Sequence, residues 1–196
     1  MVVCAGDIVG YCANPNECAK IVKNMAGTAV LGNHDVSALT GDTTWMNPYA
    51  ARASRWTSGA LDEDSRAYLG SLKTEARLRL DGRRLAIYHG AVGSVTEYVY
   101  EEQAGEDMLE RANADVLVLG HTHVPYAKKL RTGLVVNPGS VGQPRDGDPR
   151  ASYAVLDLTA GTADIKRLDY DVEGAYDAII AAGLPEMLAE RLFMGR

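Results

Sequence analysis

Long apolar runs are absent from this sequence. No stretch approaches the ~20 consecutive apolar residues that a membrane-spanning helix needs, and no basic segment followed by a short apolar one marks a secretion signal. We therefore expect a cytoplasmic protein with no membrane association.

Positive charge is also scarce. Lysine and arginine number 20 against 26 aspartates and glutamates, which gives a net charge of −6. General binders of nucleic acid or of membrane surfaces carry a basic face, so this balance argues against both roles. An acidic protein that binds an anionic phosphate needs a local source of positive charge, and bound metal ions are the simplest source.

Cysteine is limited to Cys4, Cys12 and Cys18. The number is odd and the spacing lacks the Cys-x-x-Cys pairs of zinc ribbons. We expect reduced thiols in a cytoplasmic protein and no cysteine metal site.

The length of 196 residues and the apolar fraction of 46% suit one globular domain, which we assign to residues 1–196. Strand and helix patterns alternate in the first half, whereas hairpin patterns dominate the second. This order predicts an α/β core of two mixed sheets packed together, with helices outside. A helical segment at about 45–72 is expected to be inserted as a cap over one end of the sheets.

Apolar periodicity and turn signals give the expected bounds of the elements. Strands are expected at 2–5, 28–31, 76–80, 83–88, 115–119, 127–131, 134–136, 153–158 and 163–168. Helices are expected from about 15 to 25 and at 46–57, 62–72, 101–112, 172–182 and 185–193, with loops at 32–35 and 137–150.

All four histidines fall in three short motifs, and each motif follows an apolar run. The motifs are Gly-Asn-His-Asp at 32–35, Tyr-His-Gly at 88–90 and Gly-His-Thr-His at 120–123. A fourth apolar run, at 2–5, leads to Asp7. These positions are the carboxyl ends of strands, where open α/β sheets bind ligands.

Each motif alone has an ordinary structural explanation, as a turn, a helix cap or a buried histidine. His121 and His123 are a stronger signal, because residues i and i+2 of an extended chain point to one side and can face one metal ion. Four strand ends that carry Asp, Asn and His together are hard to produce by chance.

These residue types indicate metal-dependent hydrolysis. A carboxylate bridges two cations, an Asn oxygen is a neutral ligand, and imidazole suits Zn, Fe, Ni or Mn. Two such ions roughly 3.5–4 Å apart clamp the oxygens of a phosphoryl displacement and generate a metal-bound hydroxide near neutral pH. His34 is the best candidate for the general acid that protonates the leaving oxygen. Asp35 is expected to hold the tautomer of His34 and to raise its pKa.

In this order, the motifs Gly-Asp-Ile-Val-Gly-Tyr (6–11), Gly-Asn-His-Asp, Tyr-His-Gly and Gly-His-Thr-His resemble the calcineurin-like metallophosphoesterase superfamily. The tail Asn-Pro-Gly-Ser-Val-Gly-Gln-Pro-Arg from 137 to 145, with Ala-Ser-Tyr-Ala-Val at 151–155, resembles its small bacterial and archaeal phosphodiesterase branch. The resemblance implies a four-layer αββα sandwich with a dinuclear metal centre at the strand ends.

The resemblance also implies roles for single residues. Asp7 would bridge the two metal ions, and His123 would bind the first. His34 would be the catalytic histidine that binds no metal, with Asp35 as its orienting partner. The remaining ligands of the second ion would be Asn33, His89 and His121.

One family motif is missing. The family opens with a strand that ends in Asp-x-His, and this sequence contains no Asp-x-His. The first ion would keep only Asp7 and His123, so we expect fewer than two bound ions, and a fold shortened at its N-terminus by one strand and helix. A truncated gene product is the favoured explanation, and a natural single-metal variant or a partner that supplies the strand are the alternatives.

The substrate signals are weaker. Arg145 and Arg150 suit phosphate binding, and a solvated loop accounts for them equally well. Asn137 and Ser140 are expected to line the site, and Tyr11 either stacks on a base or aryl group or is an exposed turn residue.

We therefore predict a metallophosphoesterase that acts on a small phosphoester or nucleotide, with its oligomeric state left open. A scaffold or other binding member of the same fold is the alternative that the missing ligands favour. A metal-binding protein without hydrolytic activity is a third.

Overall fold

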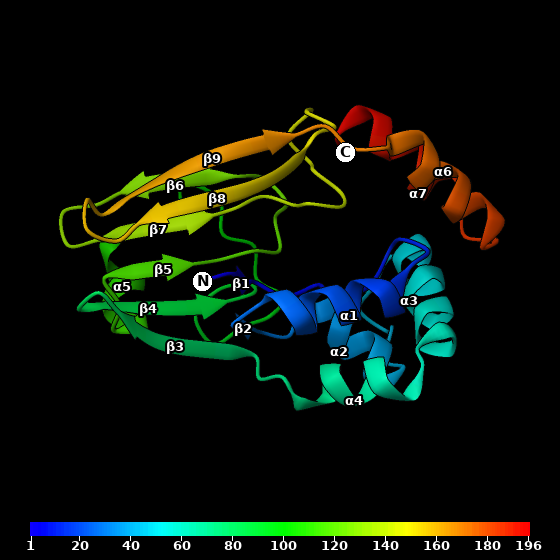
Figure 1. Ribbon diagram of the computed structural model, residues 1–196, viewed down its shortest axis with the longest axis horizontal. Helices are drawn as coiled ribbons and strands as arrows, with labels where there is room; N and C mark the ends of the chain where they lie inside the picture. Colours follow the sequence, from blue (N-terminus) through cyan, green and yellow to red (C-terminus); the bar gives the residue numbers. More distant parts are fainter.

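A mixed sheet of five strands forms the centre of the protein. The computed structural model describes residues 1–196 and is shown in Figure 1. The strand order is β3-β4-β5-β7-β6, with β4, β5 and β7 parallel and the two outer strands antiparallel to their neighbours. The strands are β3 Glu75–Leu80, β4 Arg83–Tyr88, β5 Val116–Val118, β6 Tyr126–Lys129 and β7 Leu134–Asn137.

The second layer of strands consists of two separate pairs. The short strands β1 (Val3–Cys4) and β2 (Thr28–Ala29) are parallel, whereas β8 (Ala151–Asp157) and β9 (Thr162–Leu168) form an antiparallel hairpin. The second of the two predicted sheets is thus divided into a parallel and an antiparallel pair, because no hydrogen-bonded ladder joins them.

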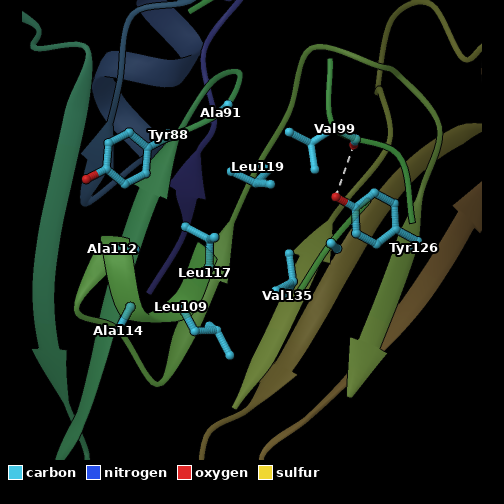
Figure 2. Close-up of a cluster of buried hydrophobic side chains, with 12 residues drawn as sticks. Tyr88, Ala91, Val99, Leu109, Ala112, Ala114, Leu117, Leu119, Tyr126 and Val135 are labelled. Atoms are coloured by element: carbon cyan, nitrogen blue, oxygen red, sulfur yellow. Dashed lines mark hydrogen bonds between the residues drawn. The ribbon is translucent and has the colours of Figure 1, made fainter. Parts of the chain in front are cut away.

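Two apolar clusters fix the order of the layers. Val30, Ile87 and Val136 belong to a buried cluster that β1 and the β8–β9 hairpin also contact, so it lies between the two strand layers. On the other face of the five-stranded sheet, the helix α5 (Glu106–Ala112) packs through Leu109 and Ala112 (Figure 2).

Helices cover the outer side of the β1–β2 pair. The cluster there joins residues of α1, α2 and α4 to those of the first two strands. These helices are α1 Pro15–Met25, α2 Asn33–Thr40 and α4 Glu63–Ser71. The four-layer αββα arrangement predicted from the sequence is confirmed.

A further group of helices lies at one end of the sandwich, to the right in Figure 1. Helix α3 (Pro48–Ala60) packs through Ala53 against α6 (Val172–Ala181), α7 (Glu186–Glu190) and the 3-10 helix η1 (Arg191–Met194). The segment predicted as a cap, about 45–72, contributes α3 and α4.

Two predicted elements differ from the structure by a turn of helix or more, and one predicted turn is confirmed. Residues 32–35 are not a loop, because α2 begins at Asn33 directly after the extended Gly32. The helix expected at 101–112 begins only at Glu106, with Gly105 extended before it. Asp81 and Gly82 have φ values of 48° and 77°, the left-handed pair that a tight hairpin requires.

None of the helices combines the length and the apolar character needed to cross a membrane.

Candidate metal centre

The four motifs meet at one end of the strand layers. Asp7 follows β1, Asn33 begins α2 just after β2, His89 follows β4, and the Gly-His-Thr-His segment follows β5. Since β1 and β2 are parallel to each other, and β4 and β5 likewise, the carboxyl ends of each pair open in the same direction.

Four potential ligands converge there. The nearest ligand atoms of Asp7, His89 and His121 all lie within 4.8 Å of one another. The Nε2 atom of His89 is 3.2 Å from the Oδ2 atom of Asp7 and 2.9 Å from the Oδ1 atom of Asn33. One carboxylate, one amide oxygen and two imidazoles therefore surround a common point, which is a suitable donor set for a divalent transition metal.

The imidazole rings are held by backbone carbonyls. The Nδ1–H group of His89 donates to the carbonyl of Ala5 at 2.7 Å, because a carbonyl can only accept. His121 uses Nε2 in the same way, at 3.0 Å from the carbonyl of Thr96, and His123 uses Nδ1, at 2.7 Å from that of Gln143. Each ring keeps its other nitrogen for a metal ion, which is the arrangement that metal-binding histidines usually have.

The backbone at the ligands is strained. Asp7, His121 and His123 have φ values of 53°, 65° and 60°, in the left-handed region that side chains other than glycine rarely adopt. Such conformations cost about 1–3 kcal/mol each and concentrate at functional sites. They turn these three side chains toward the centre immediately after their strands end.

Gly32 allows Asp7 to occupy its place. A Cβ atom at Gly32 would collide with the carboxylate and the backbone nitrogen of Asp7. The glycine that opens the Gly-Asn-His-Asp motif is therefore required by close packing between the first two ligand loops.

Burial and charge set the protonation of the ligands. Burial lowers the pKa of His121 to about 4 and that of His123 to about 3, with the charges of His89 and Arg145 respectively adding to the effect. Burial disfavours the charged forms of Asp7 and His89 as well. Their mutual attraction outweighs it, so the pKa of Asp7 is lowered and that of His89 is raised. At neutral pH, His121 and His123 are thus in the neutral form that binds metals.

His34 lies beside the ligands without joining them. Its backbone N–H donates to the Oδ1 atom of Asp7 at 2.9 Å, and its ring centroid is 4.3 Å from that of Tyr11. The Nδ1 atom is buried and has no hydrogen-bond partner.

The predicted contact between Asp35 and the ring of His34 is wrong. The fully buried carboxylate of Asp35 accepts hydrogen bonds from the backbone N–H groups of Val9 at 3.0 Å and of Gly32 at 2.8 Å. Asp35 therefore ties the loop after β1 to the start of α2. The pKa of His34 is lowered, chiefly by burial, and not raised as predicted.

A cavity of about 490 Å³ opens over the centre. It is lined by seven residues that the sequence analysis singled out, Asp7, Tyr11, Asn33, His34, His121, His123 and Arg145. Six further lining residues were not predicted, and they are Trp45, Met46, Asn47, Ala50, Thr96 and Tyr98. Four of the six lie in the segment that was expected to cap one end of the sheets, whereas Thr96 and Tyr98 had no such signal in the sequence.

Asn137 lies outside the cavity, so its predicted substrate contact is wrong. It is fully buried, and its Nδ2 group donates to the carbonyl of Gly120 at 2.7 Å and to the Oγ1 atom of Thr122 at 3.0 Å. Its Oδ1 atom accepts from the N–H of Gly139 at 3.0 Å. Asn137 therefore holds the segment that carries His121.

The two arginines of the 137–150 loop differ. Arg145 lines the cavity, and its guanidinium donates to the Oε1 atom of Gln143 instead of a carboxylate. Arg150 is paired with Asp148 at 2.7 Å, away from the cavity. The Oγ atom of Ser140 accepts from the backbone N–H groups at 142 and 143, which is a turn contact.

The sequence and the fold match one family of metal-dependent enzymes. The model of the calcineurin-like phosphoesterase superfamily domain matches residues 1–161. The chain belongs to the calcineurin-like phosphoesterase superfamily. Members of this superfamily use divalent metal ions, and the donor set around Asp7 is consistent with such an ion.

Relatives support the assignment over the whole chain. The chain is 33% identical over 213 aligned positions to the uncharacterized protein MJ0912 of Methanocaldococcus jannaschii, and the match covers 100% of this chain and 86% of that protein. The crystal structure of a metallophosphoesterase from Sphaerobacter thermophilus superposes with a TM-score of 0.84 at 33% identity. That match covers 98% of this chain and 86% of the other.

A shorter match carries a more specific name. Phosphodiesterase YfcE of Escherichia coli strain K12 is 54% identical over 43 residues, which are 22% of this chain and 23% of that protein.

Proposed function

We propose that this protein is a divalent-metal-dependent phosphoesterase whose ion is held by Asp7, Asn33, His89 and His121. The convergence of these four donors at the strand ends, with each imidazole oriented by a backbone carbonyl, is the observation that carries the proposal. A bound divalent ion supplies Lewis-acid activation of water and neutralises charge on a phosphoryl group. Manganese, iron, zinc and nickel all suit these donors.

A second ion would have fewer ligands from this chain. His123 is held by the carbonyl of Gln143 and lines the same cavity as Asp7, so these two residues would be the ligands of a second ion. The sequence offers no Asp-x-His pair to complete that position. We therefore propose one tightly bound ion per chain and at most weak binding of a second.

His34 is proposed as the proton donor. It lines the cavity, it is not among the residues around the ion, and its Nδ1 atom is buried without a partner. The remaining ring atom, Nε2, is the one that would deliver a proton to the leaving oxygen. Tyr11 packs against the ring and limits its movement.

Arg145 is proposed to bind the substrate phosphate. Its charge faces the cavity and is engaged only by an amide oxygen of Gln143 and by the ring of Tyr11, 5.6 Å away. A guanidinium can replace such contacts with a bidentate bond to phosphate. The short match to a protein named as a phosphodiesterase favours diesters as substrates.

A binding or scaffold role on the same fold is the second candidate, and the missing Asp-x-His pair favours it. A scaffold has no use for a proton donor beside its metal site. The loss of His34 should then leave metal binding and partner binding intact, whereas a hydrolase should lose turnover.

The experiment is hydrolysis of bis(4-nitrophenyl) phosphate by the protein loaded with Mn²⁺. Turnover should disappear with EDTA and return with Mn²⁺. His34→Ala should lower kcat about 10²-fold or more, the usual size of general-acid catalysis, and should keep its metal. Tyr153→Phe, on the exposed outer face of β8, is the control and should match the wild type. A protein with full metal content and no turnover of diesters or monoesters would support the scaffold role.

A further inference from the structure

Two aromatic residues of the cavity, Trp45 and Tyr98, take no part in the proposed chemistry, and we call them the aromatic wall. Trp45 is 48% exposed and Tyr98 is 44% exposed, and both line the cavity that holds the metal ligands. The other tryptophan, Trp56, packs against the cluster of C-terminal helices. A large ring left half in water inside a cavity offers apolar area to a ligand.

The segment that carries Trp45 is fixed in place. Residues 41–47 connect α2 to α3, and the hydroxyl of Ser37 donates to the carbonyl of Asp42 within it. The guanidinium of Arg55 donates to the Oγ1 atom of Thr43 at 2.8 Å. The turn that carries the indole is therefore held by contacts at Asp42 and Thr43, so this part of the backbone needs little ordering when a ligand binds.

Tyr98 is fixed by its neighbour in the chain. Val99 is buried, and its carbonyl accepts a hydrogen bond from the hydroxyl of Tyr126 at 3.1 Å, as Figure 2 shows. The ring of Tyr98 stacks on that of His121, with centroids 4.0 Å apart, and on that of Tyr100 at 6.1 Å. A group held against Tyr98 thus lies directly beside a metal ligand.

The same cavity contains the positive charge of Arg145. It therefore combines a metal site and a cation, which suit a phosphate, with two half-exposed aromatic rings, which suit a flat apolar group. Its volume of about 490 Å³ lies in the usual range for small-molecule sites. A ligand with both parts would contact all of these features at once.

We infer that Trp45 and Tyr98 form a specificity subsite for a planar aromatic ester group, a nucleobase or an aryl ring, on the phosphoester substrate. This inference rests on the proposed function and names the substrate class of that site. Stacking on a protein aromatic ring stabilises a bound base enough to change affinity by roughly tenfold or more.

The test uses three inhibitors with the same charged head. The inhibitors are three monoesters of methylphosphonic acid, with ethanol, with phenol and with the 5′ oxygen of adenosine. Each is measured as a competitive inhibitor of bis(4-nitrophenyl) phosphate hydrolysis by the Mn²⁺-loaded protein. The wild type should bind the phenyl or the adenosine ester about tenfold more tightly than the ethyl ester. The ester with the larger advantage identifies the ring as aryl or nucleobase.

Variants assign the advantage to the aromatic wall. Trp45→Ala should reduce it to about twofold or less, and Trp45→Phe should keep most of it. Tyr153→Ala, which removes an equally exposed tyrosine outside the cavity, should leave it unchanged. Equal weakening of all three esters by Trp45→Ala, or no advantage in the wild type, would overturn the inference. If the protein hydrolyses no diester, the proposed function fails, and calorimetric titration of the same esters still tests the subsite.

Discussion

Replacement of Asn137 by alanine tests whether the metal ligands depend on buried polar contacts outside the cavity. Asn137 makes three hydrogen bonds, to Gly120, Thr122 and Gly139, and its side chain is fully buried. At about 1 kcal/mol of net stabilisation per bond, Asn137→Ala should lower the free energy of unfolding by about 3 kcal/mol. Two of the lost bonds hold the segment that carries His121, so Mn²⁺ affinity should also fall about 10- to 100-fold.

The assay for Asn137→Ala is urea unfolding in EDTA, because a bound ion would add its own stabilisation. The midpoint should fall by about 1 M or more, given an m-value of about 2–3 kcal/mol/M. Calorimetric titration with Mn²⁺ gives the affinity. Asn24→Ala, on the exposed side of α1, is the control and should shift the midpoint little. A variant of Asn137 with unchanged midpoint and affinity would refute the reasoning.

Two further predictions concern packing and pH. Gly32→Ala places a methyl group against Asp7 and should destabilise the metal-free protein by about 1–3 kcal/mol. Gly59→Ala, in open space within α3, should instead stabilise it by about 0.5–1 kcal/mol, and equal effects of the two variants in urea unfolding would contradict this account. A hydrogen bond from Arg84 holds the pKa of Asp115 at about 2, below the ordinary value, so this pair stabilises the fold above about pH 4 and the stabilisation is lost as the pH falls toward 2. Both side chains are partly exposed, so Asp115→Asn should cost under about 1 kcal/mol at pH 6 and clearly less at pH 2, and an equal cost at the two pH values would contradict the assignment.

The ligand set could be predicted from the sequence because it depends on local pattern. A buried strand that ends in a small residue and then a polar one delivers that polar side chain to the end of a sheet. Asp7 and His121 follow this pattern, His89 comes directly after the last strand residue Tyr88, and the structure brings the three together.

The supporting contacts could not be predicted in the same way. Asp35 turns toward Val9 and Gly32 because α2 begins at Asn33 and points its third residue, the last of the motif, into the protein. Asn137 was assigned to substrate because it lies in a polar loop, but it is the last residue of β7 and faces inward. Both outcomes depend on packing between segments that are distant in the sequence.

The aromatic wall illustrates a second limit. Trp45 and Tyr98 are separated by 53 positions of the chain, and only the fold places them around one cavity. The division of the second strand layer into two pairs also depends on tertiary structure, because the sequences of β1 and β8 do not determine which strands pair with each other.

The most direct test of the metal centre is the manganese content of two variants after dialysis against Mn²⁺ and desalting. His34→Ala should retain about one ion per chain, as the wild type does, while His121→Ala should retain almost none. Circular dichroism confirms that both are folded. Loss of the ion from His34→Ala, or its retention in His121→Ala, would contradict the assignment of proton donor and ligand on which the account rests.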